Sequence, residues 1–211
     1  MTPVEQTNRK SIRVDLQIIA DMIEPGTRLL DVGCGNGDLL DYLVHSKQVD
    51  GRGIELSTEG VRSCVNSGLS VIQGDADTDL GSYPDQAFDY VVLSQTLQTV
   101  TAPRVVLENM LRIGRRAIVS FPNFAYWRLR FHLALHGQMP VSKSLPYHWF
   151  DTPNIHLCTI KDFLETCDEL GVTVERSVAL NKEGRVRRIR SGPFLANLFG
   201  VQAVFVLRLL K

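Results

Sequence analysis

Apolar residues recur along this chain at two spacings, one typical of helices and the other typical of short strands. A spacing of three or four residues predicts a first helix at residues 8–24. The apolar stripe of that helix consists of Ile12, Leu16, Ile19 and Ile23. Short apolar runs bounded by glycine and polar residues predict strands at 28–32, 51–56, 69–73, 87–94, 116–121, 172–178 and 201–210.

Further helices are predicted between these runs, at residues 38–45, 57–68, 103–111 and 159–170. Ser57 can cap the second of them, and Pro103 suits the first turn of the third. Thr159 and Asp162 have the spacing of a capping pair at the start of the last one. Because strands and helices alternate, the sequence predicts an α/β protein with a doubly wound, largely parallel sheet and helices on both faces.

The whole chain, residues 1–211, is expected to form a single domain, since we find no repeat and no linker. The alternation of strands and helices stops after Pro122, and residues 122–154 are interpreted as a lid or insertion. We find no apolar run long enough to span a membrane and no signal peptide near Met1. The four cysteines are scattered along the chain, which is typical of a protein in the reducing cytoplasm, the expected location. Because their spacing does not match that of metal ligands, no metal is expected.

Charge is distributed unevenly, although the formal net charge is zero. Residues 1–108 hold 16 acids and 8 bases, whereas residues 109–211 hold 7 acids and 15 bases, and residues 109–150 contain no acid. Residues 121–155 also contain 8 of the 16 aromatic residues, interleaved with arginine and histidine. These features are typical of a docking surface or of base stacking. The alternatives are a solvated surface whose charges neutralise each other and a helical lid packed over the sheet.

The candidate chemistry begins where the first strand meets its helix, at residues 31–37. Gly33, Gly35 and Gly37 allow a tight turn and the close approach of a ligand. The third glycine of a dinucleotide fingerprint is absent, because Asp38 stands three residues after Gly35. Asp31 and Asp38 would also repel a pyrophosphate, so an uncharged or cationic ligand suits the turn better.

S-adenosylmethionine is a ligand with cationic groups, because it carries a sulfonium and an ammonium but no phosphate. Asp31 can pair with the ammonium, and Glu55, at the end of the next strand, can accept both ribose hydroxyls. Asp75 and Ala76 follow the third strand, where a carboxylate and a backbone amide can bind adenine. The alternative is that the glycines serve only strand-to-helix packing and that the acids are solvated.

Over residues 25–120 these motifs resemble the seven-stranded, Rossmann-like S-adenosylmethionine-dependent methyltransferases. The whole chain more specifically resembles the MetW family of methionine-biosynthesis proteins, in the segments 30–37, 51–55, 68–77, 93–98, 116–124 and 152–159. The resemblance implies an antiparallel C-terminal strand and S-adenosylmethionine or S-adenosylhomocysteine as the bound molecule. It also implies a protein partner, homoserine O-acyltransferase, whose activity the family is thought to support.

The sequence leaves the reaction open, because no methyl acceptor or catalytic base can be identified. The chain lacks the G-x-S-x-G motif of an α/β-hydrolase, so it is not expected to be the acyltransferase itself. An accessory subunit of that enzyme is the first hypothesis, and a methyltransferase acting on an unidentified small molecule is the alternative. A nucleic-acid methyltransferase is disfavoured, because the segment after residues 87–94 lacks the Asn/Asp-Pro-Pro-aromatic motif.

Overall fold

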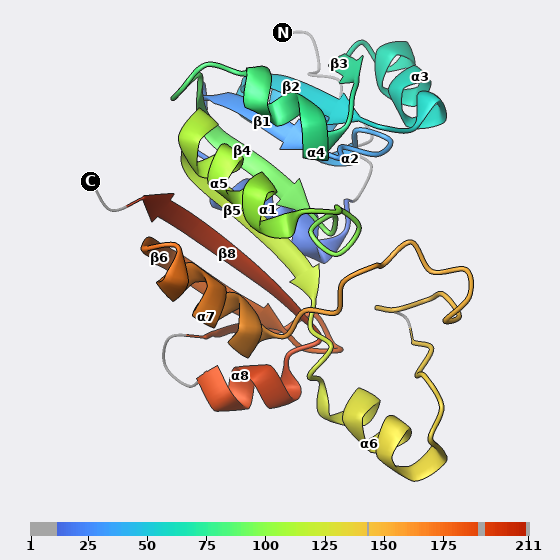
Figure 1. Cartoon of the computed structure of the whole chain (residues 1–211). Coiled ribbons are helices and arrows are strands. Elements are labelled where there is room, and N and C mark those ends of the chain that lie inside the picture. Colours follow the sequence, from blue (N-terminus) through green and yellow to red (C-terminus); the bar gives the residue numbers. More distant parts are fainter. Residues whose placement is uncertain (1–11, 143, 190–192, 210–211) are drawn as a thin grey trace, which may run out of the picture.

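The computed structural model describes residues 12–142, 144–189 and 193–209, and its strands form one twisted sheet (Figure 1). The strand order is β3-β2-β1-β4-β5-β8-β6-β7. The strands are β1 (Arg28–Val32), β2 (Asp50–Glu55), β3 (Ser70–Gln73), β4 (Phe88–Ser94), β5 (Gly114–Pro122), β6 (Val172–Leu180), β7 (Val186–Arg188) and β8 (Gln202–Leu209).

The first five strands are parallel, whereas β8 is antiparallel to both β5 and β6, and β7 is antiparallel to β6. The predicted α/β fold, mostly parallel with an antiparallel C-terminal strand, is therefore confirmed. One strand was not predicted from the sequence, the short edge strand β7. Its three residues are all exposed, so it lacks the apolar run by which buried strands are identified.

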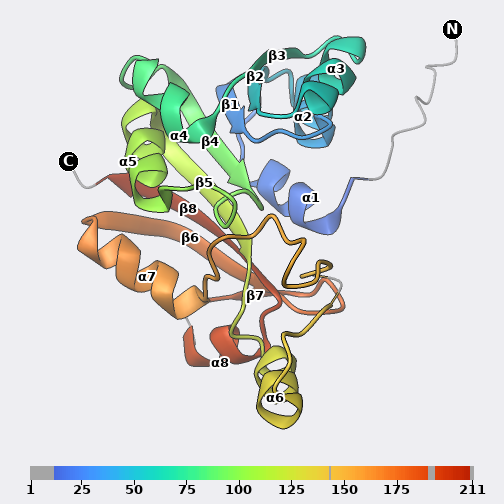
Figure 2. The same cartoon turned by 45° about the vertical axis from the view of Figure 1, so that its right-hand side comes forward.

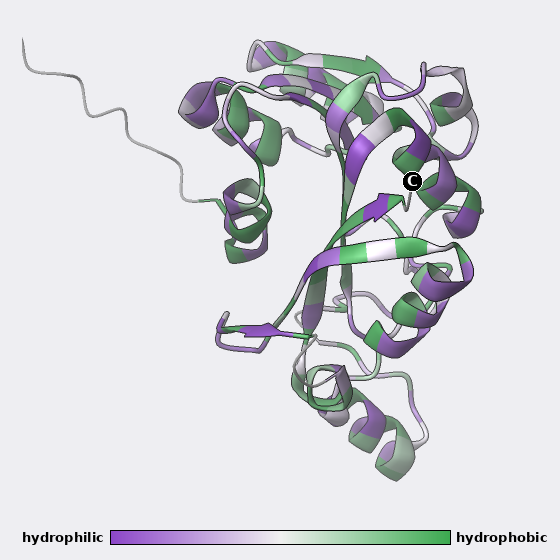
Figure 3. Ribbon diagram, turned by 90° about the vertical axis from the view of Figure 1, so that its left-hand side faces the viewer, coloured by the Kyte–Doolittle hydropathy of each residue, from purple (hydrophilic) through white to green (hydrophobic). Residues whose placement is uncertain are grey.

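Helices cover both faces of the sheet (Figures 2 and 3). One face packs against α1 (Val14–Asp21), α2 (Asp38–Lys47) and α3 (Thr58–Asn66). The other face packs against α4 (Ala76–Asp79), the 3-10 turn η1 (Leu80–Ser82), α5 (Pro103–Ile113), α7 (Ile160–Glu169) and α8 (Pro193–Phe199). Alternate residues of each central strand belong to the two cores, as in β4, where Tyr90 faces one core and Val91 the other.

The predicted caps form as expected and fix where the helices begin. The Ser57 hydroxyl accepts a hydrogen bond from the Gly60 amide, 3.2 Å away, at the start of α3. Thr159 and Asp162 form a complete capping box at the start of α7. The predicted helix at 8–24 corresponds to α1, and its first four residues lie outside the described part of the chain. Within the described residues, no helix has the length and apolar character needed to cross a membrane.

Residues 122–154 contain α6 (Trp127–His136), which lies beyond the end of the sheet in both views (Figures 1 and 2). Leu129 is the buried residue of this helix. A helical lid is one of the alternatives that the sequence offers for this segment, but it gives no bounds for the helix, because the large apolar residues alternate with smaller or polar ones, a pattern typical of strands. The interpretation of this segment as a lid stays a prediction, as does the description of the chain as one domain.

Candidate functional site

The candidate site lies at the carboxyl ends of β1 and β4. The chain winds from β1 outward through β2 and β3, then returns to place β4 on the other side of β1. Such a switch in strand order leaves a crevice at the carboxyl edge of the sheet. A cavity of about 370 Å³ occupies this position. Its lining residues are Arg13, Leu16, Asp31, Gly33, Cys34, Gly35, Asn36, Asp38, Leu39, Ser94, Gln95 and Thr96.

The glycine turn after β1 forms one wall of the cavity, and its geometry requires glycine. Gly33 has φ +70°, and its amide donates a 2.8 Å hydrogen bond to the Ile54 carbonyl in β2. A Cβ atom at Gly33 would lie 2.7 Å from Thr96 Oγ1 on the opposite wall. Gly37 has φ +82° and is the N-cap of α2. The turn is therefore hydrogen-bonded to β2 on one side and packed closely against Thr96, in the loop after β4, on the other.

Glu55 holds the glycine turn in place, because its carboxylate accepts two backbone hydrogen bonds. One comes from the Gly35 amide at 2.8 Å, and the other comes from the Ser57 amide at 2.9 Å. Each carboxylate oxygen keeps a second lone pair, so further hydroxyl donors can still bind. Glu55 therefore contacts the glycine loop directly, although it does not line the cavity itself.

Asp31 is the buried acid of the site, with 2% of its surface exposed. Burial, and to a smaller extent the nearby Glu55 charge, together raise the pKa of its carboxyl to about 7. The buried Asp31 Oδ1 atom has no hydrogen-bond partner. A cationic donor that reached this atom would supply the missing hydrogen bond and offset the cost of burying the charge.

Asp75 and Ala76 lie beside Glu55 but outside the cavity lining. The Gly74 amide donates to the Glu55 carbonyl at 3.1 Å, which holds the loop after β3 against the end of β2. Asp75 caps α4 by accepting from the Asp77 amide at 2.9 Å. Of the predicted residues, Asp31, Gly33 and Gly35 line the cavity, whereas Gly37, Glu55, Asp75 and Ala76 do not.

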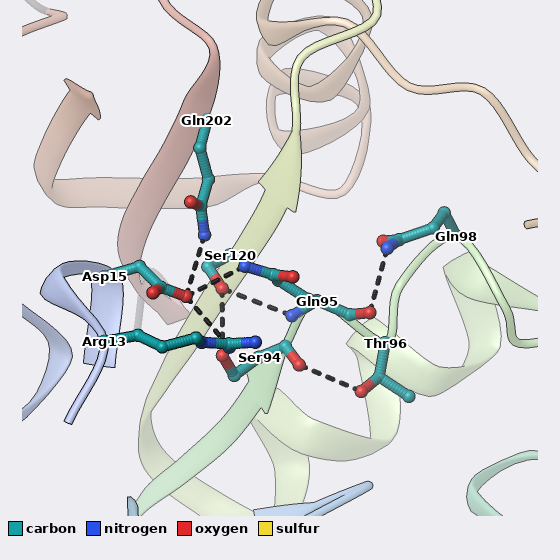
Figure 4. Close-up of polar contacts among 8 residues, drawn as sticks. All are labelled: Arg13, Asp15, Ser94, Gln95, Thr96, Gln98, Ser120 and Gln202. Atoms are coloured by element: carbon teal, nitrogen blue, oxygen red, sulfur yellow. Dashed lines mark hydrogen bonds and ion pairs between the residues drawn. The ribbon is translucent and has the colours of Figure 1, made fainter. Parts of the chain in front are cut away.

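A network centred on Asp15 forms the opposite wall and was not predicted from the sequence (Figure 4). Asp15 Oδ2 accepts hydrogen bonds from Gln95 at 2.9 Å, from Gln202 at 3.1 Å and from Arg13 at 3.1 Å. Gln95 has φ +56°, an uncommon value for a residue other than glycine. Asp15 thereby fixes α1, the loop after β4 and the start of β8 around the cavity. The sequence signal that could have identified it is an acid beside the apolar stripe of the first helix, Asp15, three residues after Ile12.

The sequence profile described as "Methionine biosynthesis protein MetW" matches residues 13–207. The chain belongs to the MetW family. A bifunctional methionine biosynthesis protein MetXA/MetW from Rhodopirellula baltica is 36% identical over 177 residues, which cover 80% of this chain and 28% of that protein. A fatty-acid O-methyltransferase from Mycolicibacterium smegmatis is 31% identical over 116 residues, covering 53% of this chain and 42% of the relative. The MetW chain thus spans less than half the length of either relative.

Solved structures establish the fold of this MetW-family chain as that of the S-adenosylmethionine-dependent methyltransferases. A possible histamine N-methyltransferase from Thermotoga maritima superposes with a TM-score of 0.67 at 18% identity, covering 92% of this chain and 87% of the other. An S-adenosylmethionine-dependent methyltransferase from Mesorhizobium loti superposes with a TM-score of 0.67 at 17% identity, covering 93% and 98%. At these identities the likeness shows the fold alone.

The cysteines beside the MetW cavity are unsuited to nucleophilic catalysis. Burial and then the Asp31 charge raise the pKa of Cys34 far above its ordinary value, so its sulfur stays protonated. Cys64, whose sulfur lies 4.0 Å from that of Cys34, also has a raised pKa, chiefly because of burial. Among the described residues, no cluster of acids, histidines and cysteines could hold a metal ion.

Proposed function

We propose that this chain binds S-adenosylmethionine or S-adenosylhomocysteine at the glycine turn and acts as an accessory subunit of homoserine O-acyltransferase. The observation that carries the partnership is the Rhodopirellula baltica relative, which bears the names MetXA and MetW on one chain. Two functions fused in one protein are held at high effective concentration, which suits proteins that act together. We take the MetXA part to be the acyltransferase.

The chemistry of the described residues supports the choice of an adenosyl ligand. The unpartnered Asp31 Oδ1 suits the ammonium of the methionine part, directly or through water. Glu55 keeps lone pairs for both ribose hydroxyls while it holds the Gly35 amide. Asp75 and the Ala76 amide, beside the end of β2, suit the adenine ring. Binding of this ligand by an accessory subunit would let the pathway respond to a product made from methionine.

Titration calorimetry with S-adenosylmethionine and S-adenosylhomocysteine tests the ligand. We expect one ligand per chain and a higher melting temperature when it is bound, because a ligand specific for the folded state stabilises it. Glu55→Gln should weaken binding, whereas Glu59→Gln, an exposed acid on α3, should not. If neither nucleoside binds at millimolar concentration, the ligand assignment is wrong.

Co-expression with the homoserine O-acyltransferase of the same organism tests the partnership. We expect the two proteins to co-purify, and we expect acyl transfer to homoserine to be faster with this chain than without it. Equal activity with and without the chain, together with the absence of a complex, would refute the accessory role.

The alternative is a methyltransferase acting on a small molecule. The cavity favours it, because Ser94, Gln95 and Thr96 place polar groups across from the glycine turn, where an acceptor would sit. Methyl transfer needs chiefly proximity and in-line geometry, which such a cavity can supply without a strong base. Incubation with methyl-labelled cofactor and a metabolite extract should then yield a labelled product, and its persistent absence would argue against this function.

A further inference from the structure

The helix α6 carries two apolar stripes rather than one. Its large apolar residues, at every second position, are Trp127, Leu129, Phe131, Leu133 and Leu135. Successive residues of a helix are turned by about 100°, so alternation distributes these side chains over opposite sides. Leu129 and Leu133, four residues apart, share the first stripe, and Leu129 anchors the helix to the body with 5% of its surface exposed.

The second stripe, Trp127, Phe131 and Leu135, lies on the side of α6 opposite Leu129 and is exposed along its length. The spacing of four residues places these side chains one above another on one side of α6. Trp127 is 38% exposed, Phe131 58% and Leu135 63%, and Leu133 of the first stripe is 40% exposed, so Leu129 is the buried member of the two stripes. The helix itself lies beyond the end of the sheet (Figures 1 and 2), and we call its exposed stripe of Trp127, Phe131 and Leu135 the ridge. An exposed apolar stripe at this spacing is typical of a helix that enters a groove on another protein.

The charge around the ridge is positive on both sides. By helical geometry Arg128 and Arg130 flank the stripe, both are exposed, and neither forms an ion pair with a residue that the structure describes. The Arg128 guanidinium carbon lies 5.3 Å from the ring centroid of Trp127, so this cation borders the apolar surface. No acid lies at residues 109–150 to neutralise these charges locally. A complementary surface is therefore apolar at its centre and acidic at its rim.

We propose that the Trp127–Phe131–Leu135 ridge of α6 docks into an apolar groove, rimmed by carboxylates, on homoserine O-acyltransferase; this inference rests on the function proposed above. A second copy of this chain is a poorer occupant, because a symmetric contact would oppose the arginines of one ridge to those of the other. A nucleic acid is also a poorer occupant, since proteins bind single strands in a basic groove rather than along a protruding apolar ridge.

The test compares Phe131→Glu with Val65→Glu, a matched control on α3 that is 55% exposed. Biolayer interferometry on the immobilised acyltransferase of the same organism measures the affinity of each variant. We expect Phe131→Glu to bind at least about 30-fold more weakly, as for a buried aromatic anchor, and Val65→Glu to bind within about twofold of the native chain. Both variants should keep the native melting temperature and the native affinity for S-adenosylhomocysteine, which shows that they are folded.

Replacing both flanking arginines in Arg128→Glu/Arg130→Glu tests the acidic rim. We expect slower association than for the native chain at low salt and a weaker dependence of affinity on salt, because the steering charges are reversed. Unchanged association rates at low salt would contradict an acidic rim on the partner.

The outcomes separate this inference from the proposed function. If the native chain binds the acyltransferase and Phe131→Glu binds it equally well, the ridge is not the docking surface, while the partnership stands. If Phe131→Glu instead converts a dimer of the free chain into a monomer, as measured by light scattering, the ridge joins two copies and the inference is overturned. If the native chain itself does not bind the acyltransferase, the proposed partnership is wrong, and the docking inference that rests on it is wrong as well.

Discussion

Replacing Asp31 with asparagine is expected to stabilise the ligand-free protein at alkaline pH while weakening its affinity for an adenosyl cofactor. The reason is that Asp31 is buried with one oxygen unpartnered, so its charge is costly until a cation arrives. Asparagine has a similar shape and no charge. If Asp31 serves binding at the expense of stability, its replacement should raise stability and lower affinity. If it serves only folding, its replacement should not raise stability.

The expected size follows from the pKa of the buried carboxyl. Burial, together with the Glu55 charge, raises this pKa from 3.8 to about 7, so the folded chain holds the proton more tightly than the unfolded chain. Folding is therefore not penalised below pH 3.8, and the penalty grows as the pH rises through about 7. Its full size is about 4 kcal/mol, of which about 2.5 kcal/mol arises between about pH 5 and about pH 8.

Urea unfolding followed by tryptophan fluorescence, at about pH 5 and about pH 8, measures this effect. The gain in free energy of unfolding from Asp31→Asn should be larger at about pH 8 by about 2.5 kcal/mol. Asp50→Asn, at an exposed acid at the start of β2, serves as the control and should follow the native pH dependence. Calorimetry should show weaker binding of S-adenosylmethionine. If Asp31→Asn changes stability equally at both pH values, the carboxyl is not the buried, high-pKa group described here.

Three further substitutions test the walls of the site. Glu55→Gln should weaken adenosyl binding by about 1–3 kcal/mol and lower stability by about 1 kcal/mol in calorimetry and urea unfolding, because the acceptor of two backbone amides loses its charge. Asp15→Ala should cost about 2–4 kcal/mol, or roughly 5–10 °C in melting temperature, because three donors lose their acceptor. Gly33→Ala should cost about 1–3 kcal/mol, because its Cβ would meet Thr96, and adding Thr96→Ala should recover part of that loss.

Simple observations would contradict each of these three predictions. Native affinity in Glu55→Gln would show that the ligand does not use this acid. A melting temperature for Asp15→Ala within about 2 °C of the native value would show that the network is solvated and carries little energy. A Gly33→Ala variant that is as stable alone as with Thr96→Ala would show that the contact between the two walls is not close.

The sequence predicted the elements that depend on local signals. The glycine turn after β1 was recognised because its conformation is decided by the residues within it, and all three glycines have positive φ. The capping box at Thr159 was recognised for the same reason. The edge strand β7 was not predicted, because it has no buried side. The helix α6 was considered only as an unbounded helical lid, because its alternating pattern is typical of a strand.

The sequence by itself determined the order of strands and helices, the turn that forms the cavity wall and the acids beside it. It also determined family membership, because the motifs that carry the resemblance are contiguous segments. Only the tertiary structure decided which distant residues meet. Asp15 contacts Gln95 and Gln202, which are 80 and 187 positions away, and the unpaired Asp31 oxygen exists only after burial. Long-range packing sets both features, and no local sequence pattern encodes which buried atom is left without a partner.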